Sequence, residues 1–140
     1  LAAFVDNLTF TGTADIAATG NNDANVIIGN SGANTIKAGG GDDRIEGAGG
    51  NDTMDGGTGN DTFVFGAGTL GNDTIKAFAG NGAALGDSIE FDTSVFANFA
   101  AVQAAAALDA SGKNMVITHA TGTITLLKIT ALDVNDFTFV

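Results

Sequence analysis

The sequence contains no cysteine, proline, tryptophan or tyrosine. Without cysteine, neither a disulfide framework nor a thiolate metal site can form. The single histidine, His119, has no second histidine with which to build a zinc site, and no hydrolytic triad can be assembled around it. Only 5 residues are basic against 16 acidic ones, which gives a net charge of −11. This charge excludes nucleic acid as a partner, because a duplex needs a basic surface.

Long apolar runs are also missing. The longest is the alanine-rich stretch 99–108, which is far too short to span a bilayer, so we expect no membrane insertion. The opening residues "LAAFVDNLTF" have no basic region and no long apolar core, unlike a secretory signal. Because the chain starts at Leu1 rather than methionine, we expect it to be a piece of a longer protein. The sequence does not indicate an oligomeric state.

Glycine, in contrast, is abundant, and most of the 21 glycines follow a nine-residue repeat between residues 20 and 75. Apolar residues stand nine apart at Ile27, Ile36, Ile45, Met54 and Phe63. Two positions before each of them comes Asn25, Asn34, Asp43, Asp52 or Asp61. We number the repeat positions one to nine from Gly20, Gly29, Ala38, Gly47 and Gly56. The apolar residue is then at position eight, and the amide or carboxylate is at position six.

This period fits a turn of six residues followed by a strand of three, with the central strand residue pointing inward. Two units make one coil of a flattened spiral, so units two apart stack at about 4.8 Å. Asp43 then lies beside Asp61, where like charges repel and the interior is thin. A cation between stacked turns would remove this repulsion. The available donors are carboxylate and carbonyl oxygens, which favour Ca²⁺ over Mg²⁺ or zinc.

The repeat resembles the RTX (repeats-in-toxin) nonapeptide G-G-x-G-x-D-x-U-x, where U is a large apolar residue. The segment "GGTGNDTFV" (56–64) matches every fixed position. "GAGGNDTMD" (47–55) departs only at Ala48, and "AGGGDDRIE" (38–46) departs only at Ala38. "GNNDANVII" (20–28) and "GNSGANTIK" (29–37) carry asparagine at position six, so weaker or empty sites are expected there. The resemblance implies a mainly β fold, a right-handed parallel β-roll of about three coils that binds several Ca²⁺ ions.

The resemblance also implies which residues hold the ions. Position-two and position-four carbonyls and the position-six carboxylate come from one turn. Carbonyls at positions one and three and the position-six carboxylate come from the turn two units later. The first implied site comprises Gly39, Gly41, Asp43, Gly56, Thr58 and Asp61. The second, which uses a degraded sixth unit, comprises Ala48, Gly50, Asp52, Gly68, Leu70 and Asp73. The third comprises Gly57, Gly59, Asp61 and Asp87. Earlier sites would pair Asn25 with Asp43, and Asn34 with Asp52 together with Gly47 and Gly49.

The second half of the chain has a different composition. The stretch 92–112 predicts one helix with Thr93 or Ser94 as its N-cap and with Phe96, Phe99 and Val102 on its buried stripe. Residues 115–118 and 123–129 predict a hairpin. We divide the chain into a β cap (1–19), the roll (20–76) and a C-terminal capping α+β segment (77–140), within one continuous domain.

This second half also resembles the C-terminal cap and secretion tail of the family, ending in Asp136 and "FTFV". That implies export by a type I (ABC-transporter) system that reads an uncleaved C-terminal signal, and an extracellular or cell-surface location on a Gram-negative bacterium. We expect no catalysis in this chain. Two alternatives stay open, a calcium-rigidified stalk of an adhesin or surface-layer protein and an accessory domain of a secreted hydrolase or polysaccharide-modifying enzyme.

Overall fold

The strands form two sheets in a computed structural model that describes residues 6–68, 70–80 and 86–140. The six-stranded sheet has the spatial order β1 (Asn7–Thr9), β3 (Val26–Ile28), β5 (Arg44–Glu46), β7 (Thr62–Phe65), β9 (Ser88–Phe91) and β13 (Phe137–Phe139). The seven-stranded sheet has the order β10 (Ala106–Leu108), β11 (Met115–His119), β12 (Gly122–Leu126), β8 (Gly71–Lys76), β6 (Thr53–Thr58), β4 (Thr35–Gly40) and β2 (Ala17–Thr19).

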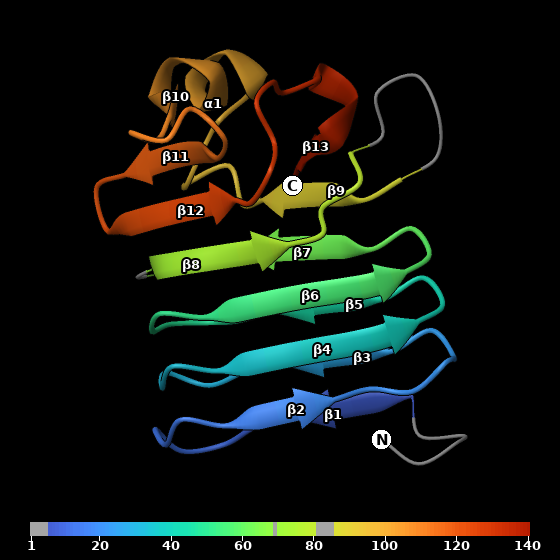
Figure 1. Cartoon of the computed structure of the whole chain (residues 1–140). Coiled ribbons are helices and arrows are strands. Elements are labelled where there is room, and N and C mark those ends of the chain that lie inside the picture. The colour runs from blue at the N-terminus through green and yellow to red at the C-terminus, as the bar shows by residue number, and fades with distance from the viewer. Residues whose placement is uncertain (1–5, 69, 81–85) are drawn as a thin grey trace.

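Successive strands alternate between the two sheets, so the chain winds as a spiral. Every pairing in the six-stranded sheet is parallel, as is every pairing from β2 to β12 in the other. Figure 1 shows the strands stacked in chain order from β1 and β2 at the N-terminal end to the cap at the other end. The predicted parallel β-roll is therefore confirmed, and its sheets continue beyond the repeats on both sides.

The core is a double column of the position-eight side chains. In one sheet Ile27, Ile45 and Phe63 lie in register, and in the other Ile36 pairs with Met54. Each of these five side chains is 0 % exposed. A residue in the middle of a three-residue strand faces the opposite sheet, because neighbouring side chains alternate between faces. The inward direction predicted from the nine-residue period is thus confirmed for all five.

Strand lengths differ from the expected three residues. β3 and β5 have three residues, whereas β4 and β6 have six. The additional pairs are Gly39 with Gly57 and Gly40 with Thr58, which lie in the turn segments of the repeat. Stacked turns on this side of the roll therefore run close enough to extend the ladder of backbone pairs.

The long predicted helix is wrong. The structure has a short helix, α1 (Phe99–Ala105), whose N-cap is Asn98, with its side chain accepting from the Ala101 N–H. The following alanines form β10, which pairs with β11. Sheet pairing thus overrides the high helix propensity of alanine, because tertiary contacts outweigh local preference. Phe96 precedes the helix rather than lying on it, and its ring packs edge-on against Phe91 at 4.9 Å.

The remaining C-terminal elements close the end of the roll. The predicted hairpin is confirmed as β11 and β12, with His119 opposite Gly122, and it ends at Leu126 rather than Ile129. A single 3-10 turn, η1 (Val134–Asp136), leads into β13, which pairs with β9. No helix in the described part of the chain is long and apolar enough to cross a membrane.

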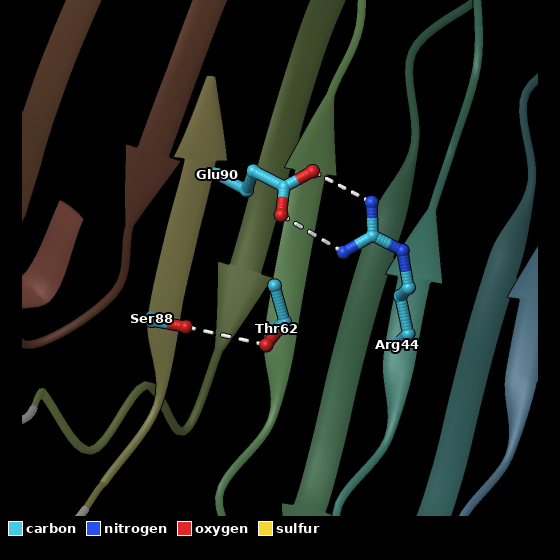
Figure 2. A network of polar contacts seen from close by, with 4 residues as sticks. All are labelled: Arg44, Thr62, Ser88 and Glu90. Atoms are coloured by element: carbon cyan, nitrogen blue, oxygen red, sulfur yellow. Dashed lines mark hydrogen bonds and ion pairs between the residues drawn. The ribbon is translucent and has the colours of Figure 1, made fainter. Parts of the chain in front are cut away.

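An ion pair on the outer face joins three strands of the six-stranded sheet. Arg44 on β5 reaches over β7 and forms two hydrogen bonds with Glu90 on β9, at 2.6 and 3.0 Å (Figure 2). Beside it, the Thr62 and Ser88 hydroxyls lie 3.2 Å apart. These contacts align β9 with the repeats that precede it.

Candidate metal centre

The position-six residues form a ladder along each edge of the roll. The Oδ1 atom of each aspartate accepts from the backbone N–H of the position-six residue two units earlier. These N–Oδ1 distances are 2.7 Å (Asn25–Asp43), 2.8 Å (Asn34–Asp52), 2.9 Å (Asp43–Asp61), 2.9 Å (Asp52–Asp73) and 3.0 Å (Asp61–Asp87). The structure therefore brings together the carboxylate pairs expected from the sequence, across the longer intervals to Asp73 and Asp87 as well.

The second carboxylate oxygen of three aspartates has no hydrogen-bond donor. Asp43, Asp52 and Asp61 are 2 %, 1 % and 1 % exposed, and the Oδ2 atom of each is buried without a partner. A buried acceptor that is left unsatisfied costs about 1–3 kcal/mol, and more when it is charged. Such atoms are rare in native proteins and indicate an ion or water that completes them.

Burial makes these carboxylates hard to ionise. The pKa of Asp43 and of Asp61 is raised to about 6, mainly by burial and also by nearby acidic groups, although backbone N–H donors act in the opposite direction. Burial raises the pKa of Asp73 to about 7 and also raises that of Asp52 and Asp87. A divalent cation would offset both the burial and the repulsion between acidic groups. It neutralises the negative charge and takes the place of the lost water.

Turn carbonyls supply further oxygens between stacked turns. A methyl group added to Gly57 would overlap the Gly39 carbonyl oxygen, and one added to Gly59 would overlap that of Gly41. The carbonyls at positions two and four therefore face the turn two units later. On the other edge of the roll, the carbonyl of Gly50 in turn 47–52 is directed at Gly71 in the same way. Only glycine leaves room for this approach.

The oxygen set fits a hard cation. Within the described residues, no three Asp, Glu, His or Cys side chains gather into a metal-binding cluster. Each candidate centre is instead a carboxylate pair supplemented by carbonyls. Ca²⁺ accepts six to eight such oxygens in a flexible geometry. In the first predicted site, Gly39, Gly41 and Asp43 face the turn that contains Gly56 and Asp61, and Thr58 lies at the end of β6.

The second predicted site is partly assembled. Ala48 holds the left-handed backbone conformation, with φ of 67°, and the Asp52 N–H donates to Asp73. Gly68 has φ of 151°. Leu70 is buried, and its N–H donates to the Thr121 hydroxyl at 3.3 Å.

In the third predicted site, Asp87 already has donors for both carboxylate oxygens. The Asp61 N–H bonds to Oδ1, and the Ala79 N–H bonds to Oδ2 at 2.8 Å. Gly57 and Gly59 lie in the adjacent turn. Residues 81–85, which precede Asp87 in the chain, lie outside the described residues.

The asparagine units are also stacked under aspartate turns. Asn25 is 1 % exposed beneath Asp43, and Asn34 is 1 % exposed beneath Asp52. A methyl group at Gly47 would overlap the free Oδ2 of Asp52, and Gly49 follows two residues later. The sequence interpretation overlooked the position-two asparagines of these units, Asn21 and Asn30, although both units contain the pattern N-x-x-x-N.

Comparison with known families identifies the repeat. The profile of the RTX calcium-binding nonapeptide repeat matches four times, over residues 19–54, 28–63, 41–69 and 67–81. A comparison with curated protein sequences gives no match.

Solved structures share the fold. The extracellular lipase LipA from Serratia marcescens superposes with a TM-score of 0.68 at 16 % identity, over 93 % of this chain and 20 % of the lipase. The AlgE6R3 subunit of the Azotobacter vinelandii mannuronan C5-epimerase gives 0.72 at 23 % identity, over 92 % of this chain and 80 % of the subunit. The AlgE6R2 subunit gives 0.61 at 20 % identity, over 99 % and 94 %. This chain thus spans a fifth of the lipase and most of each epimerase subunit. Residues 19–81 of this chain thus carry RTX calcium-binding nonapeptide repeats.

Proposed function

We propose that this chain is a domain that folds when Ca²⁺ binds between its stacked turns, and that it carries the secretion signal of a larger protein. The observation that carries the folding proposal is the set of buried, donorless Oδ2 atoms on Asp43, Asp52 and Asp61. A fold that buries three carboxylate oxygens without donors is unfavourable until a cation completes them.

In the best-formed centre, Asp43 and Asp61 would hold the ion with the carbonyls of Gly39 and Gly41 and with Gly56 and Thr58 of the later turn. The ion supplies positive charge to these oxygens when it is bound. The chain's own part is to hold the oxygens in place. The Asp43 N–H fixes the Asp61 carboxylate at 2.9 Å, and glycines allow the carbonyls to approach. Ion affinity then becomes folding free energy.

The second centre would use Ala48, Gly50 and Asp52 with Gly68, Leu70 and Asp73. The third would use Gly57, Gly59 and Asp61 with Asp87. Asp61 is common to the first and third centres, so loss of its carboxylate would affect both.

Circular dichroism tests the folding proposal. At pH 7.5 the chelated chain should lack the β spectrum, and millimolar Ca²⁺ should restore it, whereas Mg²⁺ at the same concentration should not. The charge of the repeat region supports this outcome, because residues 20–75 contain eight acidic and two basic residues. A β spectrum of full strength in chelator would contradict the proposal.

The proposed export signal is part of the folded structure. Phe137 is 6 % exposed, its ring stacks at 6.1 Å from Phe91, and the Val140 N–H donates to the Phe91 carbonyl. A transporter that reads residues 136–140 would therefore have to do so before β13 joins β9. Low calcium inside the cell would keep the tail available, and high calcium outside would fold it away.

Deletion of residues 136–140 would remove a strand as well as a signal. Lysine substitutions at the exposed, uncharged side chains of the tail, Thr138 and Val140, and at Val134 just before it separate the two roles. Export through a co-expressed type I system should fall while the calcium-induced β spectrum is unchanged. Undiminished export would place the signal elsewhere.

A second candidate is an accessory module of a secreted enzyme. Chains of similar fold occur in an extracellular lipase and in subunits of a polysaccharide epimerase. The sequence upstream of Leu1 would decide between these contexts and the stalk of a surface protein, because a catalytic domain or a tandem array would be visible there.

A further inference from the structure

The repeat turns fall into two classes. We call residues 20–25 and 29–34 the asparagine turns, because positions two and six are both asparagine. We call 38–43, 47–52 and 56–61 the aspartate turns, because position two is glycine or alanine and position six is aspartate. Positions two and six therefore change together, which a gradual loss of calcium ligands at position six alone does not explain.

The two asparagine turns make the same internal hydrogen bonds. In the first, Asn25 Nδ2 donates to Asn21 Oδ1 at 3.1 Å, and in the second, Asn34 Nδ2 donates to Asn30 Oδ1 at 3.1 Å. The same acceptors also receive the position-four N–H, each at 2.8 Å. The turns differ at one atom, because Asn25 Oδ1 also accepts from the Asn21 N–H at 3.0 Å, whereas Asn34 Oδ1 is buried without a hydrogen-bond partner. We call this pair of side chains the asparagine clasp.

In the second turn, the clasp nitrogen also contacts oxygens that a cation would use. Asn34 Nδ2 donates to the Gly32 carbonyl, at position four, and approaches Asp52 Oδ1 at 3.3 Å. A neutral NH₂ group thus presents its hydrogens to a carbonyl and a carboxylate from two stacked turns. An ion placed among these oxygens would compete with the nitrogen for the same space.

The backbone separates the two classes independently. Positive φ occurs at positions two and four of every aspartate turn, at Gly39, Gly41, Ala48, Gly50, Gly57 and Gly59. Among the residues that the structure describes, neither position has positive φ in either asparagine turn. The asparagine turns therefore follow a different path from the turns whose carbonyls surround the candidate centres.

We propose that the asparagine clasp closes the first turn of the nine-residue repeat on each edge of the roll in place of calcium. This inference rests on the proposed calcium function of the aspartate turns, and it gives the asparagine turns a role of their own in place of the weaker or empty sites expected there. The repeat would then change from amide-closed turns at 20–25 and 29–34 to calcium-closed turns from Ala38 onward. The ladder bonds from Asn25 to Asp43 and from Asn34 to Asp52 join the two parts.

The chain offers a direct test in turn 29–34. The double substitution Asn30→Gly with Asn34→Asp converts "GNSGAN" into "GGSGAD", which is a complete repeat motif. Native mass spectrometry in saturating Ca²⁺ should count one more ion per chain than in the unmodified protein. Asn30→Gly alone removes the clasp without adding a carboxylate and should add no ion. Asn22→Asp adds the same charge to an exposed side chain of the other asparagine turn and should also add none.

A second measurement reads the clasp itself. In the calcium-loaded protein, the side-chain amide protons of Asn25 and Asn34 should exchange slowly with D₂O by NMR, unlike those of exposed Asn22. An unchanged ion count in the double variant together with fast exchange of these protons would overturn the proposal. If the unmodified chain binds no calcium at all, the proposed function fails, and slow amide exchange still supports the clasp.

Discussion

Lowering the pH should stabilise the calcium-free fold and so partly replace calcium. The size of this gain in stability depends on the pKa values of the buried carboxylates. Burial raises the pKa of Asp43 and Asp61 from 3.8 to about 6 in the folded chain. Their ionised forms are therefore disfavoured by folding, which reverses the usual behaviour of surface carboxylates. Between pH 6 and pH 4 the folded chain binds protons that the unfolded chain does not, so the stability of the calcium-free fold rises as pH falls through this window.

The size of the effect follows from the shifts. One pKa unit corresponds to about 1.4 kcal/mol, so each of the two groups destabilises the calcium-free fold by about 3 kcal/mol above pH 7. At pH 4.5 most of that penalty is relieved, which gives roughly 2 kcal/mol per group. A gain of about 4 kcal/mol is a large part of the 5–15 kcal/mol that typically stabilises a domain. Asp73, with a pKa of about 7, adds to the gain in the same direction.

The assay is circular dichroism of calcium-stripped protein between pH 7.5 and 4.5. The β signal should increase on acidification, with a midpoint between pH 4 and 6. The control is the Asp43→Asn, Asp61→Asn double variant, in which the acid-induced gain should shrink because neither side chain titrates. A signal that falls steadily from pH 7.5 to 4.5 would refute the reasoning, since it would mean that these carboxylates are stabilised as anions.

Four substitutions test single contacts in the calcium-loaded protein. Asp61→Asn should raise the calcium concentration at the folding midpoint by at least tenfold in a titration followed by circular dichroism, because two centres share this carboxylate. Gly57→Ala should lower the unfolding free energy in urea by more than about 2 kcal/mol, because φ is 101° and the methyl group meets a backbone carbonyl. Ala48→Gly should raise it by about 1 kcal/mol, because alanine is held at φ of 67°. Arg44→Ala should cost less than about 1 kcal/mol in the same assay, since its pair with Glu90 is partly exposed.

Much of the roll could be predicted from the sequence because a nine-residue period has few structural solutions. The period assigns Ile27 and Ile45 to one sheet and Ile36 and Met54 to the other, and the observed register agrees. The stacking of Asp43 under Asp61 follows from the same arithmetic. The geometry of one repeat unit therefore also predicts the overall fold, because each unit contacts mainly the units two steps away.

The capping region could not be predicted in this way. The alanines 104–107 favour a helix in isolation, yet Ala106 and Ala107 pair with Ile117 and Val116 in a strand. These paired residues are about ten positions apart in the sequence, and no periodic pattern predicts that they pair. Local propensity is a weak guide wherever a free sheet edge offers backbone partners.

Some features of the site were also hidden in the sequence. The second donor to Asp87, the Ala79 N–H, belongs to a backbone group without any side-chain signature. The asparagine clasp did have a signature, the spacing shared by Asn21 with Asn25 and by Asn30 with Asn34. A loss of acidic ligands accounts for the asparagine at position six alone, so it does not point to position two.

The most direct test of the account is a crystal structure of the protein grown in Ca²⁺, collected with anomalous scattering. We predict a calcium ion between turns 38–43 and 56–61, at roughly 2.3–2.6 Å from oxygens of Asp43 and Asp61 and from the carbonyls of Gly39 and Gly41. Turns 20–25 and 29–34 should contain none. Water alone between Asp43 and Asp61 in such a crystal would contradict the claim that calcium joins the stacked turns.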